Sequence, residues 1–129
     1  MRRKLAVQVR VLSREIFALK GERAMFDKFD YSLIPDYTIS ALRDWVVNGI
    51  YPGGFLTAVL TNDLSRAVWA ADGQNLRAIP QIAMFCYNRI PSGCQGSVDA
   101  VCDWPWRLQK YLDDGYDMEA EWKKISKMP

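Results

Sequence analysis

The sequence of 129 residues contains no histidine. This absence excludes Ser–His and Cys–His nucleophile pairs, imidazole general bases and metal sites that need an imidazole ligand. The three cysteines, Cys86, Cys94 and Cys102, are spaced eight residues apart and form no C-x-x-C pair. Zinc sites normally use four ligands at short paired spacings, so a zinc site is not expected. We therefore expect no metal ion, no other cofactor and no enzymatic activity.

Long hydrophobic runs are also missing. The apolar stretch that follows Arg2, Arg3 and Lys4 is interrupted by Gln8 and Arg10, and by further charges beyond them. It can therefore serve neither as the core of a signal peptide nor as a membrane span. An odd number of cysteines without a signal peptide is typical of reduced thiols in a cytosol. We expect a cytoplasmic protein that makes no membrane contact.

The charges are nearly balanced but unevenly distributed. Seventeen Lys and Arg against fifteen Asp and Glu leave a net charge of +2, which does not by itself indicate nucleic-acid binding. Residues 1–25 hold seven bases and two acids, whereas residues 113–121 hold five acids and no base. Two solvated surfaces explain this pattern most simply. The alternatives are a basic N-terminus that contacts phosphate or an acidic surface, and ends of opposite charge that meet across a subunit interface. The candidate contact residues are Arg2, Arg3, Lys4, Arg10 and Arg14.

The remaining composition is that of one globular domain, with half of the residues apolar and a quarter charged. We expect a compact all-α bundle of five or six short helices over residues 1–129, with 1–25 as a basic N-terminal extension and 108–129 as a C-terminal helical tail. Apolar spacing predicts helices over 38–50, 54–71, 79–89 and 117–127, and a further helix that Ser97 caps and Pro105 interrupts.

Two helix assignments carry further expectations. Thr38 is the candidate N-cap of the helix over 38–50, and Gly49 lies near its C-terminal end. In the helix over 54–71, the buried side is expected to include Leu64, Ala67 and Val68.

Residues 4–20 allow two interpretations. One helical stripe would contain Leu5, Val9, Leu12, Ile16 and Leu19, whereas alternation at Leu5, Val7, Val9 and Val11 is typical of a strand. No other segment has the pattern of a strand that could pair with it, so a helix is favoured. A strand that pairs with the same strand of another subunit stays open.

The loop over 92–97 is the best candidate for binding a small anion. Its two glycines allow backbone N–H groups to turn outward, and it leads into a helix N-terminus, where the helix dipole favours negative charge. It lacks the lysine, the spacing and the preceding strand of known phosphate-binding loops, and an ordinary helix cap has the same pattern. Asn62 and Asp63 also allow two interpretations. In a functional role they would project into a cleft, whereas in a structural role they would be exposed helix residues or would form a hydrogen bond to a neighbouring loop. The candidate ligand-binding residues are Asn62, Asp63, Ser92, Gly93, Cys94, Gly96 and Ser97.

The cysteines and tryptophans are candidates for reactive or exposed positions. Cys94 in this loop is a candidate for an exposed thiol whose pKa the helix N-terminus lowers, whereas Cys86 on an apolar face is expected in the core. The tryptophans are expected to pack in the core and around the interruption at Pro105, and an alternative leaves one or two of them exposed to stack on a base or to anchor an interface. The five are Trp45, Trp69, Trp104, Trp106 and Trp122.

Three blocks follow one another in a characteristic order. They are NGIYPGGFLTAVLTNDL at 48–64, AAD at 70–72 with Asn75, and YNRIPSGCQGS at 87–97. Over roughly residues 28–104, this order resembles a family of small uncharacterised proteins encoded by tailed phages, prophages and mobile elements. The chain departs from the family at Gln95, where an aromatic residue is usual, at Val98, where proline is usual, and at Pro80.

The resemblance implies no named activity, but it implies a phage-type accessory protein that acts in the cytoplasm of a bacterial host. We predict that the protein binds and blocks or sequesters a host component, either a defence protein or a small nucleotide-like anion. A homo-oligomer stays open. The alternative is a DNA- or RNA-associated regulator that uses the basic N-terminus, and it ranks second because no helix-turn-helix is convincing.

Overall fold

The computed structural model describes residues 30–127, and all regular structure within them is helical. The all-α expectation is therefore confirmed for this part, which holds seven α-helices in place of the expected five or six. Residues 4–20 and the contact residues Arg2, Arg3, Lys4, Arg10 and Arg14 lie outside it. The elements are η2 (Tyr31–Leu33), α2 (Asp36–Asn48), α3 (Gly54–Leu60), α4 (Leu64–Ala70), α5 (Gly73–Arg77), α6 (Ile79–Arg89), η3 (Ser92–Cys94), α7 (Val98–Asp113) and α8 (Met118–Ser126).

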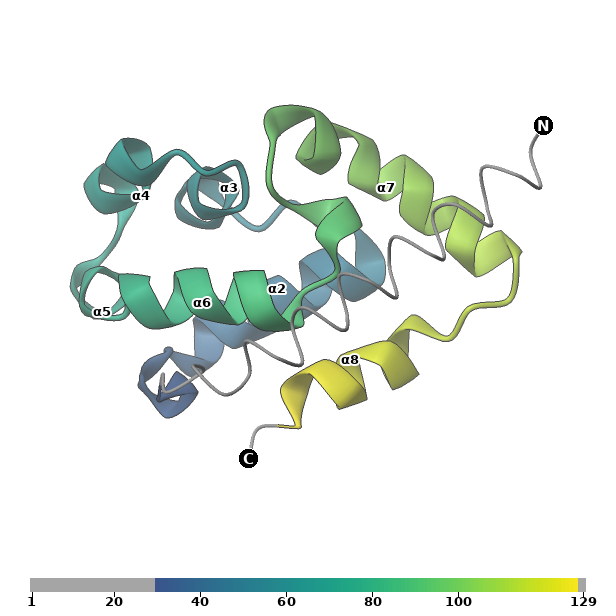
Figure 1. Cartoon of the computed structure of the whole chain (residues 1–129), viewed down its shortest axis with the longest axis horizontal. Coiled ribbons are helices and arrows are strands. Elements are labelled where there is room, and N and C mark those ends of the chain that lie inside the picture. Colours follow the sequence, from purple (N-terminus) through teal and green to yellow (C-terminus); the bar gives the residue numbers. More distant parts are fainter. Residues whose placement is uncertain (1–29, 128–129) are drawn as a thin grey trace.

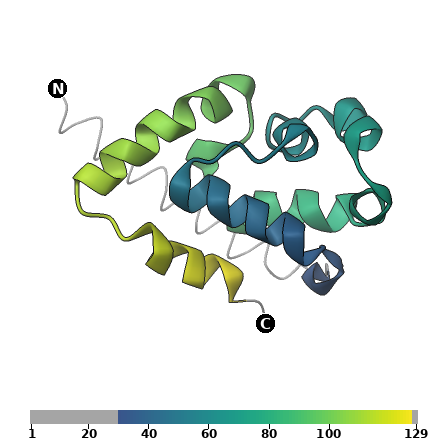
Figure 2. The ribbon, with the colours of Figure 1, turned by 180° about the vertical axis from the view of Figure 1, so that it is seen from behind.

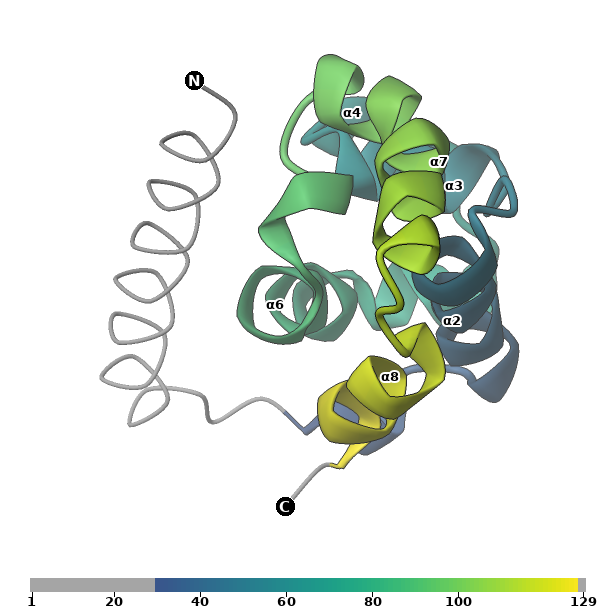
Figure 3. The ribbon, with the colours of Figure 1, turned by 90° about the vertical axis from the view of Figure 1, so that its right-hand side faces the viewer.

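Helix α2 runs through the middle of the molecule. It contacts α7 on one side and α8 on the other, as the view in Figure 2 shows. Helix α6 lies beside α2 (Figure 3), and α3, α4 and α5 gather at the end of the molecule away from the turn between α7 and α8 (Figure 1).

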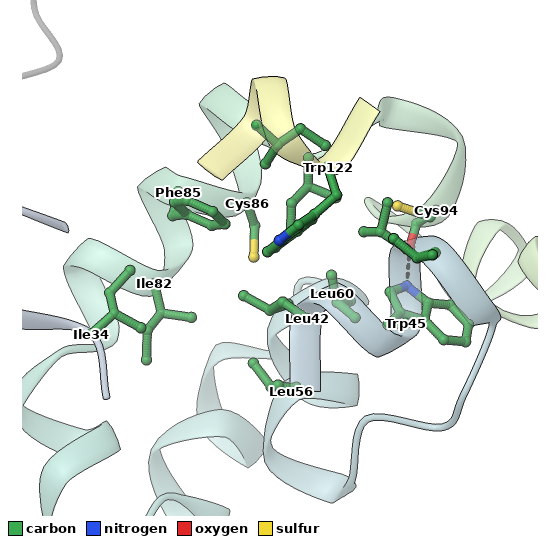
Figure 4. Close-up of a cluster of buried hydrophobic side chains, with 14 of the residues drawn as sticks. Ile34, Leu42, Trp45, Leu56, Leu60, Ile82, Phe85, Cys86, Cys94 and Trp122 are labelled. Carbon is green, nitrogen blue, oxygen red and sulfur yellow. Dashed lines mark hydrogen bonds between the residues drawn. The ribbon is translucent and has the colours of Figure 1, made fainter. Parts of the chain in front are cut away.

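The core forms where α2, α3, α6 and α8 converge (Figure 4). Leu42 of α2 and Ile82 of α6 are fully buried, and burial of a side chain of this size stabilises a fold by about 1.5–3 kcal/mol. The Phe85 ring makes edge contacts with Tyr31 at 5.4 Å and with Trp122 at 6.3 Å between ring centroids. The C-terminal helix α8 is therefore packed into the same core as α6.

Helix α2 begins earlier than its apolar pattern predicts. Thr38 is not the N-cap, because Pro35 takes that position and Thr38 lies inside the first turn. The buried Thr38 hydroxyl donates instead to Oδ1 of Asn75 at 2.5 Å, which links α2 to α5. The predicted end is confirmed, since Gly49 adopts the left-handed conformation at φ 67° and its N–H bonds to the Trp45 carbonyl at 3.0 Å.

The prediction of one continuous helix over 54–71 is wrong, because this segment forms two helices, α3 and α4. Asn62 adopts a left-handed φ of 62°, which ends the first helix, and Asn tolerates this conformation better than most residues. Asp63 then starts the second helix, since its Oδ1 accepts from the backbone N–H of Arg66 at 3.1 Å. The apolar residues on both sides of the break continue one helical spacing and so conceal it.

The later helices follow their predicted bounds closely, with one correction. Ser97 caps α7 as predicted, accepting from the Ala100 N–H at 3.1 Å. Pro105, however, does not interrupt this helix, which continues to Asp113. A proline inside a helix costs about 3 kcal/mol, and the buried side chains of Trp104 and Leu108 on either side of it hold the turn against α2.

Candidate functional site

The loop over 92–97 is fixed to the rest of the protein by hydrogen bonds. The indole N–H of Trp45 donates to the carbonyl of Cys94 at 3.1 Å (Figure 4). The side-chain amide of Gln95 donates to the carbonyls of Cys86 at 2.5 Å and Ile90 at 2.8 Å. The loop is therefore held from both sides, by α2 and by the end of α6.

The structure brings Asn62 to this loop, as the structural interpretation of that residue predicts. Its Nδ2 donates to the carbonyl of Gly96 at 2.8 Å, and the N–H of Gly96 donates back to the carbonyl of Leu60 at 2.6 Å. Asp63 faces its own helix instead, because its carboxylate caps α4. The Gly96 N–H that would bind an anion is thus already bonded within the protein.

The other loop residues also have structural positions. Ser92 is exposed, and the Ser97 hydroxyl accepts from the first turn of α7. A Cβ on Gly93 would lie 3.7 Å from the Trp104 ring, so the loop backbone packs closely on α7. The expectation that the Cys94 thiol is exposed is wrong. This side chain is fully buried, and its Sγ donates to the Pro91 carbonyl at 3.1 Å.

The other two thiols differ in their surroundings. Cys86 lies in the core as predicted, and burial raises its pKa to about 12. Cys102 is exposed on α7. Residues 30–127 contain no group of three or more His, Cys, Asp or Glu side chains that could hold a metal ion.

The sequence pattern did not point to a polar pair between α2 and α5. The Tyr37 hydroxyl donates to Oδ2 of Asp72 at 2.6 Å. The pKa of Asp72 is lowered, mainly by the backbone N–H of Asn75 and then by the Tyr37 hydroxyl. The pKa of Tyr37 is raised, mainly by its hydrogen bond to Asp72. These contacts cap α5 and attach it to α2, which is a structural role.

The tryptophans divide into two groups. Trp45, Trp104 and Trp122 are buried, as expected for most of them. Trp69 on α4 is 88% exposed and Trp106 on α7 is 69% exposed. Core packing, the favoured interpretation, therefore holds for three of the five, and the alternative of one or two exposed tryptophans describes the other two.

Helix α4 exposes nearly all of its side chains. Of its seven residues only Ala67 is buried, and Trp69 follows it by two positions, about 200° around the helix. Trp69 therefore points away from the buried side. Leu64 (67% exposed) and Val68 (46% exposed) were expected to be buried, but the break at Asn62 turns both toward solvent. We name Leu64, Val68 and Trp69 the α4 apolar surface.

A scan against protein-family models finds no match for this chain, and searches of curated proteins and of solved structures find none either. Within residues 30–127, every helix is too short or too polar to span a bilayer. Among the large apolar side chains of these residues, Trp69 in the α4 apolar surface is the most exposed.

Proposed function

We propose that this protein is a non-enzymatic binding protein that blocks or sequesters a host bacterial protein through the α4 apolar surface. The observation that carries this proposal is the 88% exposure of Trp69 on the same short helix as the exposed Leu64 and Val68. Large apolar side chains that gather on a surface mark interaction sites more often than scattered single ones do. Tryptophan is also among the residues that contribute most to protein–protein affinity.

The form of the surface favours a protein groove as the partner. Leu64 and Val68 are four residues apart on one helix, so their side chains form a ridge along one face. Such ridges fit apolar grooves of partner proteins. Asp63 and Arg66 form an exposed ion pair at 3.8 Å in the first turn of the same helix, and interfaces typically have polar rims.

The bonding of the loop makes a small nucleotide-like anion the weaker candidate. The Gly96 N–H and the Asn62 amide donate to carbonyls within the protein. The carboxylate of Asp63 lies at the end of the same break, where it would repel an anion. A protein partner needs none of these groups, and the resemblance to phage-encoded proteins supports a host defence protein in the bacterial cytoplasm as the target.

Capture from a host lysate tests the proposal with a matched pair of variants. The bait would be the full chain as wild type, as Trp69→Ala and as Trp106→Ala. Truncation of a tryptophan at the centre of an interface typically weakens binding about tenfold or more. We expect the same host protein on the wild type and on Trp106→Ala, and about tenfold less of it on Trp69→Ala.

Unchanged capture by Trp69→Ala would exclude the α4 apolar surface as the binding site. Because Trp69 is exposed, its substitution is not expected to shift the melting temperature, which gives an independent check that the variant is folded.

The nucleic-acid alternative is supported by the seven basic side chains of residues 1–25, which lie outside the described residues. Contacts with phosphate weaken steeply as salt rises. A mobility shift at low salt that disappears at high salt, and on deletion of residues 1–20, would favour this alternative over the protein partner.

A further inference from the structure

Helix α4 is attached to the molecule mainly at its two ends. It lies at the outer edge of the molecule, packed on α3 (Figure 1). Of its seven residues only Ala67 is buried, and the small side chain of alanine removes little apolar area from water. Helices shorter than about 12 residues are marginal in water on their own. The position of α4 therefore depends on the segments that precede and follow it.

The segment before α4 is bonded to the loop over 92–97. The Asn62 side-chain amide donates to the Gly96 carbonyl at 2.8 Å, and the Gly96 N–H donates back to the Leu60 carbonyl at 2.6 Å. We name this reciprocal pair of bonds the Asn62 anchor. It forms at the residue whose left-handed φ of 62° ends α3, so it fixes the direction in which α4 leaves that helix.

The segment after α4 is bonded to α2. Asp72, two residues beyond the end of α4, accepts from the Tyr37 hydroxyl at 2.6 Å and from the backbone N–H of Asn75 at 2.7 Å. Asn75 in turn accepts from the buried Thr38 hydroxyl. We name these three bonds the Asp72 anchor. Asn62 and Asp72 thus flank α4 on either side, and neither residue belongs to the α4 apolar surface.

We propose that Asn62 and Asp72 are positioning residues of the α4 apolar surface. The two anchors hold α4 in the arrangement that presents Leu64, Val68 and Trp69 to a partner, so affinity depends on residues outside the surface itself. This inference rests on the proposed function. A preorganised surface binds more tightly, because less ordering accompanies association. If opening one anchor leaves α4 in place for about a tenth of the time, the apparent dissociation constant rises about tenfold.

Amide hydrogen exchange of the full chain tests the anchors without any partner. Asn62→Asp keeps a side chain that tolerates the left-handed conformation, but it replaces the donating amide by a carboxylate. Asp72→Ala removes the acceptor oxygens of the second anchor, whereas Asp72→Asn keeps a carbonyl oxygen and an equally good helix cap. We expect the exchange rate over residues 64–71 to rise about tenfold in Asn62→Asp and in Asp72→Ala, and to return toward the wild-type rate in Asp72→Asn.

Asn48→Asp is the matched control, because it makes the same substitution at an exposed position at the end of α2. It should leave the exchange rate over residues 64–71 unchanged, and α6 should exchange at the wild-type rate in every variant. Unchanged exchange over 64–71 in both Asn62→Asp and Asp72→Ala would overturn the proposal. Faster exchange throughout the chain would also overturn it, since that result reports a loss of global stability and not the release of α4.

Capture from the host lysate with the same variants as bait connects the anchors to binding. Asn62→Asp and Asp72→Ala should retain about a tenth of the host protein that the wild type captures, and Asp72→Asn and Asn48→Asp should retain nearly all of it. Faster exchange with undiminished capture would show that the anchors do not position the surface for its partner. Absence of any capture that depends on Trp69 would instead contradict the proposed function, and the exchange measurement would still decide whether the anchors hold α4.

Discussion

The indole N–H of Trp104 donates to the backbone carbonyl of Trp45 at 2.9 Å, which joins α7 to the last turns of α2. Trp45 in turn donates from its own indole to the carbonyl of Cys94 at 3.1 Å. Both rings are buried. Two hydrogen bonds in series therefore hold α2, α7 and the loop over 92–97 in one arrangement.

Trp45→Phe should destabilise the protein by about 1–3 kcal/mol, because it removes a buried hydrogen-bond donor. The loss will include some contact area of the larger ring. Urea denaturation of the wild type and the variant measures the difference in the free energy of unfolding. Trp106→Phe replaces an exposed indole and should change that free energy by less than about 0.5 kcal/mol. Equal losses in the two variants would contradict a structural role for the Trp45 indole.

The elements that were predicted well are those whose caps and apolar spacing agree. Helix α6 matches its predicted bounds, and α8 lies within the predicted range 117–127. Ser97 is a strong N-cap, and glycine at position 49 supplies the left-handed residue that ends α2. In each case the capping residues and the apolar spacing favour the same helix. The sequence pattern is therefore sufficient to predict where that helix begins or ends.

The α4 apolar surface could not be predicted in the same way. Asp63 is a good N-cap, but the apolar residues before and after it keep one helical spacing, and the prediction followed that spacing. Whether Leu64 and Val68 are covered depends on which helices pack around α4, and that is a tertiary property. The bonding of the loop over 92–97 could not be predicted for a related reason. Its partners, Trp45 and Asn62, are more than 30 residues away along the chain.

Gly49→Ala should destabilise the protein by at least about 1–2 kcal/mol. The residue adopts a φ of +67°, which side chains with a Cβ disfavour. Its Cβ would also lie 3.3 Å from Cδ2 of Leu108, which is buried against α2. Thermal or urea unfolding measures the loss.

Gly73→Ala is the matched control, because Gly73 lies in the first turn of α5 and a Cβ there meets nothing within 4 Å. It should be neutral or slightly stabilising, since alanine restricts the unfolded chain. If Gly49→Ala were as stable as Gly73→Ala, the close contact between α2 and α7 would accommodate an added Cβ, and the prediction would be contradicted.

The hydrogen bond between Tyr37 and Asp72 should make stability depend on pH at both extremes. The pKa of Asp72 is lowered from 3.8, so its contribution is present above that value and is lost as pH falls through the lowered pKa. The pKa of Tyr37 is raised from 10.0, so its contribution is present below that value and is lost as pH rises through the raised pKa.

The measurement is the difference in melting temperature between the wild type and Tyr37→Phe as a function of pH. It should be constant near neutral pH and should shrink toward both extremes. Tyr51→Phe, at an exposed position after α2, serves as the control and should give a flat difference. A flat profile for Tyr37→Phe would show that its hydroxyl does not stabilise the ionised Asp72.

The three thiols should react at different rates in the folded protein. Cys102 is exposed, Cys94 is fully buried, and burial raises the pKa of Cys86 to about 12. Because the thiolate is the reactive form, Ellman's reagent should modify Cys102 rapidly and the other two only after local or global opening. Cys102→Ser should abolish the rapid phase, and guanidinium should release all three thiols in the wild type. Rapid reaction of a second thiol in the folded protein would contradict the burial of Cys86 and Cys94.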